Sequence, residues 1–251
     1  MSKAMIKQYA VRLGDDALVQ GHRLSQWCSK GPFLEEDLAL TNVSLDFIGR
    51  ARMFYSYAAQ LEGGDVTEDW YAYQRDCRDF TNLLIHELPT GDFAFTMARQ
   101  YLMDEFGLAF MQCLESSSDE TLAAIAAKAV KESRYHLRRS REWMLRLGDG
   151  TEESHNRLQT AVDDLWDYTA ELFELDELEQ GLANDGIAVD TIALKSNWGM
   201  AVGALLGEAT IDIPQTDRAI CGGRQGMHTE HLGHMLSDLQ FMQRAYPGQE
   251  W

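Results

Sequence analysis

Residues 129–139, AVKESRYHLRR, carry the pattern that decides the fold class. Apolar residues recur at intervals of three and four through this stretch and on both sides of it, which is the spacing of one face of an amphipathic helix. SSSDE places a serine cap and two acids before it, and LGDG follows it, so we predict a helix over 119–147. The inward stripe of this helix comprises Leu122, Ala126, Ala129, Glu132, His136, Trp143 and Leu147.

The same periodicity recurs along the chain and predicts an all-α protein. The other predicted helices are 5–28, 34–61, 67–87, 93–116, a helix from Thr151 or Ser154 to 175, a short helix after Asp190, and 228–245. In EATIDIPQ, near 208–214, apolar and polar residues alternate and a proline follows, so we predict a short extended segment there. Long helices with short connections make a bundle, and we expect one helical domain over 1–251.

The composition excludes several classes of function. The chain has 251 residues, with 22 Lys and Arg against 40 Asp and Glu, and a net charge of −18. Such a surface repels nucleic acid and anionic membranes, so neither is an expected partner. The four cysteines form no CxxC pair, and neither a signal peptide nor a membrane-length apolar run is evident. We therefore expect a soluble, cytoplasmic protein with reduced thiols.

Acidic residues on the predicted helices raise the question of a metal site. Ferritin-like di-iron bundles carry Glu-x-x-His on two of their four helices, because positions three apart share a helix face. Here Tyr135 stands three residues after Glu132, and the histidine follows one residue later, at His136. Asp46 and Asp104 lie on other predicted helices and could supply further carboxylates.

The predicted helix 67–87 should supply the second Glu-x-x-His pair and reads Asp79-x-x-Asn82 instead, with His86 at its end. Two interpretations remain open. In one, the ligand set is degenerate, no metal binds, and Asp104, Glu132 and His136 hydrogen-bond to one another. In the other, the chain is a carboxylate-bridged di-iron oxidase or oxygenase that uses Asp46, Asp104, Glu132 and His136.

A second group of histidines lies in MHTEHLGHML, at His228, His231 and His234. His231 and His234 are three apart and could share a zinc ion. The alternative, which we favour, is an ordinary helix start that is capped by Thr229 and has Glu230 in its first turn.

Basic residues are concentrated on the predicted helix 119–147. Seven of the 22 basic residues of this acidic protein lie between Lys128 and Arg146. They form either a solvated helix face with local ion pairs or a docking face for an acidic or polar partner. The predicted partner-binding residues are Arg134, Arg138, Arg139 and Arg141.

Several long blocks resemble one known family. They are YAVRLGDDALVQGHRLSQWC, EEDLALTNVSLDFIGRARMFYSYAAQL, FTNLLIHELPTGDFAFTMARQYLMDEF, AAKAVKESRYHLRRSREWMLRLGDGT, GMHTEHLGHML and AYPGQEW. These blocks resemble the ferritin-like C subunits of bacterial ring-1,2-phenylacetyl-CoA epoxidases, from near the first residue to the last.

The resemblance implies a multicomponent di-iron monooxygenase of phenylacetate degradation that epoxidises the aromatic ring of phenylacetyl-CoA. It implies three partners: a homologous catalytic subunit with the di-iron centre, a small B subunit, and a reductase subunit. The reductase carries flavin and an iron–sulfur cluster and takes electrons from NADPH. It further implies that a C subunit is structural, binds no cofactor and is not catalytic alone. We expect the isolated chain to expose a large apolar patch or to hide it in a homodimer.

Overall fold

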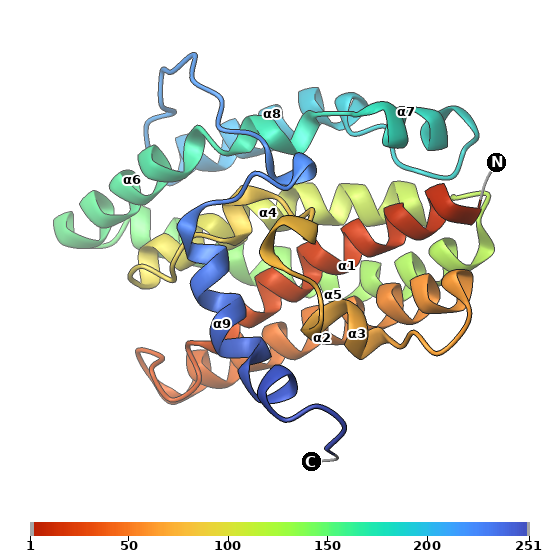
Figure 1. The fold of residues 1–251 in the computed structure, drawn as a ribbon. Coiled ribbons are helices and arrows are strands. Elements are labelled where there is room, and N and C mark those ends of the chain that lie inside the picture. Colours follow the sequence, from red (N-terminus) through yellow and green to blue (C-terminus); the bar gives the residue numbers. More distant parts are fainter. Residues whose placement is uncertain (1–2, 250–251) are drawn as a thin grey trace. The chain divides into compact units, whose positions relative to one another are not determined.

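The computed structural model describes residues 3–249, and within them the chain forms helices, short 3₁₀ turns and irregular segments without a β-strand (Figure 1). The all-α prediction is confirmed, and the fold is consistent with a ferritin-like bundle. The α-helices are α1 (Lys3–Ser25), α2 (Leu34–Glu62), α3 (Glu68–Tyr73), α4 (Phe93–Leu114), α5 (Glu120–Gly148), α6 (Glu152–Trp166), α7 (Glu177–Asn184), α8 (Lys195–Glu208) and α9 (Glu230–Ala245).

The described chain divides into two compact units. Unit 1 combines the N-terminal residues up to Pro89 with the residues from Cys221 onward, and unit 2 covers Thr90–Ile220. Each unit is described by itself below, and a single domain over 1–251 stays a prediction. The last two residues of the block AYPGQEW lie outside the described residues.

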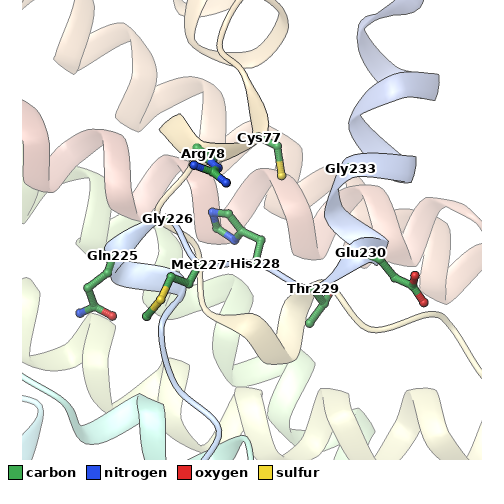
Figure 2. A pocket seen from close by; sticks show the side chains of 9 residues that line it. All are labelled: Cys77, Arg78, Gln225, Gly226, Met227, His228, Thr229, Glu230 and Gly233. Carbon is green, nitrogen blue, oxygen red and sulfur yellow. The ribbon is translucent and has the colours of Figure 1, made fainter.

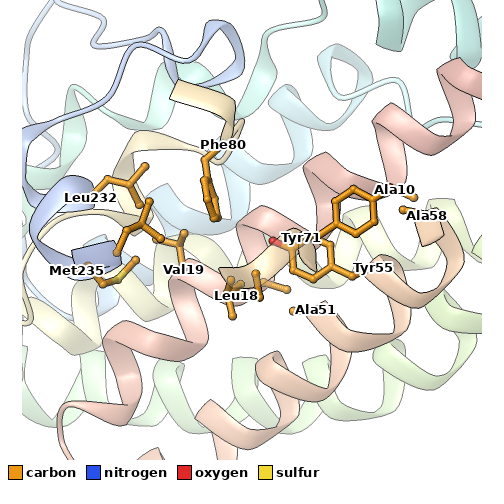
Figure 3. Packing of buried hydrophobic residues seen from close by; sticks show 13 residues of the cluster. Ala10, Leu18, Val19, Ala51, Tyr55, Ala58, Tyr71, Phe80, Leu232 and Met235 are labelled. Carbon is orange, nitrogen blue, oxygen red and sulfur yellow. The ribbon is translucent and has the colours of Figure 1, made fainter. Parts of the chain in front are cut away.

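Unit 1 is built on the pair α1 and α2, two long helices that pack along each other. A side chain at Gly14 of α1 would overlap the ring of Tyr55 on α2, so glycine permits the close approach. The core continues from this pair to α9, whose Leu232 and Met235 pack in the same cluster as Val19 of α1 (Figure 3). Burial of this apolar surface is the main stabilising contribution in the unit.

The predicted helix 67–87 is wrong beyond its first turns. Helix α3 ends at Tyr73, and the following segment contains only 3₁₀ turns at Cys77–Asp79 and Leu84–His86. Carboxylates of α1 hold this segment: Asp15 accepts the backbone N–H of Thr81 at 2.8 Å, and Asp16 accepts that of Leu83 at 2.8 Å. Backbone donors that a helix would use internally are therefore bonded to another element.

Unit 2 is built on the pair α4 and α5, with α6 and α8 packed against them. Both long helices begin at aspartate caps: Asp92 accepts from the N–H of Phe95, and Asp119 accepts from those of Thr121 and Leu122. Here the predictions 93–116 and 119–147 are confirmed to within two residues. The predicted helix to 175 ends as an α-helix at Trp166 and continues as a 3₁₀ turn, and α7 was not predicted.

The segment after α8 is non-helical, as predicted for 208–214. Helix α8 ends at Glu208, and Thr210 adopts a left-handed conformation with φ of 59°. The chain then runs without helix or strand from Ile211 to Gly222. Its start lies against α6, where Gln159 accepts the N–H of Asp212 at 2.8 Å.

Candidate functional site

A group of buried polar side chains lies between α4 and α5 in unit 2, and we call it the Asp104 cluster: Gln100, Asp104, His136, Arg139 and Ser140. The Asp104 carboxylate accepts hydrogen bonds from Gln100 Nε2 at 2.7 Å and from Ser140 Oγ at 2.8 Å. All five residues are buried, and Arg139 lies with Nη1 3.8 Å from Met97 Sδ. The prediction that Asp104 and His136 face the interior is confirmed.

The electrostatics of this cluster centre on the carboxyl group. Burial raises the pKa of Asp104 to about 6, because desolvation outweighs the opposing effects of His136, the two hydrogen bonds and Arg139. The positive groups and hydrogen-bond donors around Asp104 belong to the chain itself. They offset part of the cost of burying a carboxylate.

The buried face of α5 differs from the predicted one at residues 132 and 133. Ser133, rather than Glu132, is buried three residues before His136. Glu132 lies at the edge, with its side chain 18% exposed and 4.0 Å from Lys128. The position that bears the glutamate of a Glu-x-x-His pair is therefore occupied here by a hydroxyl group.

The buried residues of α4 and α5 do not fit a di-iron centre. Such a centre uses about four carboxylates and two histidines that project inward from the bundle helices. These two helices bury one carboxylate, Asp104, and one imidazole, His136, and they add the guanidinium groups of Arg99 and Arg139. A fixed cation beside the carboxylate repels a metal ion and takes over its electrostatic role.

The remaining predicted ligand positions belong to unit 1. Asp46 is half-buried on α2, and the inward neighbours at this part of the helix are Phe47 and Arg50, whose guanidinium lies 4.9 Å from the Phe47 ring centroid. Asn82 donates to Glu87 at 2.9 Å, and His86 is buried. Between residues 3 and 249, no group of three or more His, Cys, Asp or Glu side chains is arranged to hold a metal ion.

Unit 1 contains a second buried polar group that the sequence patterns did not identify, centred on Glu87. Its carboxylate accepts four hydrogen bonds, from Asn82 Nδ2, His228 Nδ1, and the N–H and hydroxyl of Thr229, at 2.6 to 2.9 Å. The other ring nitrogen of His228 lies 2.8 Å from the carbonyl oxygen of Phe80. Since both partners are acceptors, the ring carries a proton on each nitrogen.

This arrangement explains the ionisation of His228. Burial lowers the pKa of the imidazole, but the hydrogen bond and the charge of Glu87 outweigh burial, so the pKa lies above its ordinary value. The ion pair ties the loop before α9 to the segment after α3. Of the histidines in this segment, His228 thus forms a structural ion pair, whereas His234 is exposed.

A groove of about 610 Å³ opens beside His228 (Figure 2). Cys77 and Arg78 come from the segment after α3, and Met227, Thr229 and Gly233 come from the loop before α9 and its first turns. In Figure 2, the Glu230 side chain points away from Arg78 and His228. The His228 ring is already held on both sides, so its nitrogens are not available to a ligand in the groove.

The four arginines predicted to bind a partner separate into two pairs. Arg134 and Arg138 are exposed on α5. Arg139 is buried in the Asp104 cluster, and Arg141 is partly buried with Nη1 3.8 Å from a Glu105 carboxylate oxygen. Arg134 and Arg138 are the more exposed pair, and partner binding remains a prediction for all four arginines.

The fold is consistent with a ferritin-like helical bundle, and its helices α4 and α5 bury one carboxylate and one imidazole. A family model described as "Phenylacetic acid catabolic protein" matches residues 1–251, and the chain belongs to that family. It is 51% identical over 243 residues to the C subunit of the 1,2-phenylacetyl-CoA epoxidase of Escherichia coli (strain K12), covering 97% of this chain and 98% of that protein. Among residues 3–249, no helix has the length and apolar character needed to cross a membrane.

Proposed function

We propose that this chain is a structural subunit of a phenylacetyl-CoA epoxidase in phenylacetate catabolism. In this proposal it pairs with the homologous catalytic subunit, and a small B subunit and a reductase subunit join them in a cytoplasmic assembly. Identity of 51% over nearly the whole chain to the C subunit of such an epoxidase supports the membership in the complex. Phenylacetyl-CoA, NADPH, flavin, the iron–sulfur cluster and di-iron are handled by the other subunits.

The non-catalytic part of the proposal rests on the chemistry of the α4 and α5 interior. Oxygen activation by paired iron requires bridging carboxylates. At the spacing of a Glu-x-x-His pair, α5 has Ser133 and His136, and Arg139 adds a permanent cation one turn further. Asp104 is hydrogen-bonded to Gln100 and Ser140 rather than to a second carboxylate.

A surface feature of unit 1 supports a role in assembly. Helix α2 carries an exposed apolar row that consists of Leu34, Leu38, Leu45 and Ile48, at intervals of four, seven and three residues. We call it the α2 apolar row. These intervals place the four side chains on one face of the helix. Exposed apolar side chains gathered on one helix face are typical of contact sites between proteins.

The test is iron binding by the purified chain after anaerobic loading with Fe(II). We expect well under one iron per chain after desalting, because the carboxylate set is incomplete. The catalytic subunit, loaded in parallel, is the positive control. Two irons per chain that are lost on Glu132→Ala or His136→Ala would overturn the proposal and establish a di-iron oxygenase that uses Asp46, Asp104, Glu132 and His136.

A further inference from the structure

We infer that three cations on α5, Lys131, Arg134 and Arg138, form a docking surface for an acidic helix of a partner protein. We call them the α5 basic row. The partner is another subunit of the assembly, so the inference rests on the proposed function. It adds to that function the place of one contact and the chemistry of the surface that it meets.

The charges of the α5 basic row are not neutralised within the chain. All three side chains are exposed, and among the described residues none of them makes an ion pair. Some exposed arginines elsewhere are paired, since Arg157 lies 2.6 Å from Glu153 and Arg244 lies 2.8 Å from Asp76. In a protein with a net charge of −18, three unpaired cations within eight residues of one helix form a local concentration of positive charge.

The spacing of the row fits a helix on the other side. Intervals of three and four residues place the three cations on one face of α5, at a rise of about 1.5 Å per residue. Lys131 and Arg138 are therefore roughly 10 Å apart along the helix axis. A helix with carboxylates at i, i+3 and i+7 presents the matching row, and the forked guanidinium groups suit bidentate bonds to carboxylates.

Tyr135 restricts the side chain of Arg138 in this row. Tyr135 is 42% exposed in the middle of the row, and the guanidinium carbon of Arg138 lies 5.7 Å from the centroid of its ring. A cation held over an aromatic face loses less freedom when a partner binds. Exposed tyrosine and arginine side chains are also the residue types enriched in protein interfaces.

Nucleic acid is the competing occupant of a row of cations. Binding to a phosphate backbone requires a basic surface of larger extent, and the 40 acidic residues of this chain oppose it. An acidic face of a protein contacts a small area, so it can bind the three cations without lying against the acidic surface of the rest of the chain. The charge pattern therefore favours a protein partner.

The experiment compares Arg134→Glu/Arg138→Glu with a matched control, Lys30→Glu/Lys195→Glu. Both control lysines are exposed, and each double variant changes the net charge from −18 to −22, since two cations become two anions. Binding of each variant to the purified catalytic, B and reductase subunits is measured by biolayer interferometry between 50 and 500 mM NaCl. Thermal unfolding confirms that each variant is folded.

We expect Arg134→Glu/Arg138→Glu to weaken binding of one of the three subunits at least about tenfold and to reduce its dependence on salt. The control should bind like the wild type. Equal affinities for both variants would overturn the inference and leave the proposed function standing. Failure of the wild-type chain to bind any of the three subunits would overturn both. Salt-sensitive binding of single-stranded DNA that the same variant abolishes would assign the row to nucleic acid and overturn the inference.

Discussion

At the residue scale, the buried carboxyl group of Asp104 makes stability depend on pH. Its pKa is raised to about 6 from an ordinary value of 3.8, so the fold favours the protonated form. A group with a raised pKa contributes stability that is present below its unfolded pKa and is lost as the pH rises through its folded pKa. The loss corresponds to about 3 kcal/mol for this shift, at 1.36 kcal/mol per pKa unit.

Asp104→Asn should therefore flatten the pH profile of stability. We expect the free energy of unfolding of the wild-type chain, from urea titrations, to fall relative to that of the variant between about pH 4 and pH 7 and to run parallel to it above pH 7. Asparagine keeps a polar partner for Gln100 and Ser140 but does not ionise. Asp164→Asn, at an exposed position of α6, is the control. Parallel profiles for the wild type and Asp104→Asn would contradict the assigned pKa.

The residue scale also shows where the sequence misleads. Glu132 and Ser133 are adjacent, and a helix turns by 100° between them, so a small error in the placement of the inward face exchanges a carboxylate for a hydroxyl group. His136 was assigned correctly because apolar residues surround its face on both sides. The ion pair of His228 and Glu87 could not be found from spacing, since 141 residues separate the two.

At the element scale, the irregular segment after α3 depends on the carboxylate of Asp15. That carboxylate is fully buried and receives the guanidinium of Arg75, the hydroxyl of Tyr55 and the backbone N–H of Thr81. Arg75 also donates to the carbonyl oxygens of Tyr71 and Asp79. One side chain of α1 thus binds two points of the segment after α3, Arg75 and Thr81.

Asp15→Ala should destabilise the protein by about 3–5 kcal/mol, because it leaves the buried guanidinium of Arg75 without its counter-ion. Urea unfolding measures the loss, and Asp164→Ala provides a change of the same type at an exposed position. Amide hydrogen exchange should accelerate first at Thr81, whose N–H loses its acceptor. A loss below 1 kcal/mol would show that the Asp15 and Arg75 pair does not hold the segment.

The contrast between α5 and this segment explains how much of the fold the sequence predicts. Helix α5 has its own cap at Asp119 and a continuous apolar stripe, so local information is sufficient to place it. The segment 74–89 also has helical spacing, with Cys77, Phe80 and Leu84 three or four residues apart. Hydrogen bonds to Asp15 and Asp16 of α1, which is distant in the sequence, override that spacing. These bonds cannot be predicted from the residues of the segment itself.

At the scale of the whole molecule, the α2 apolar row bears on assembly. Leu34, Leu38 and Leu45 are each more than half exposed. These apolar side chains can be removed from water only when another molecule covers this face of the helix. In the proposed complex the row is buried against a partner. When the chain is isolated, a second copy is the available cover, so we expect a homodimer.

Leu38→Gln/Leu45→Gln should convert that homodimer to a monomer. Each substitution removes an apolar contact on both copies, because a two-fold interface uses the same residues twice. Native mass spectrometry and sedimentation at 1 to 50 μM measure the change, and the free energy of unfolding should shift by less than about 0.5 kcal/mol per exposed site. Met200→Gln, at an exposed apolar residue of α8, is the matched control and should leave the dimer intact. A wild-type chain that stays monomeric at 50 μM, or a double variant that dimerises like the wild type, would contradict the assignment of the α2 apolar row as the contact between copies.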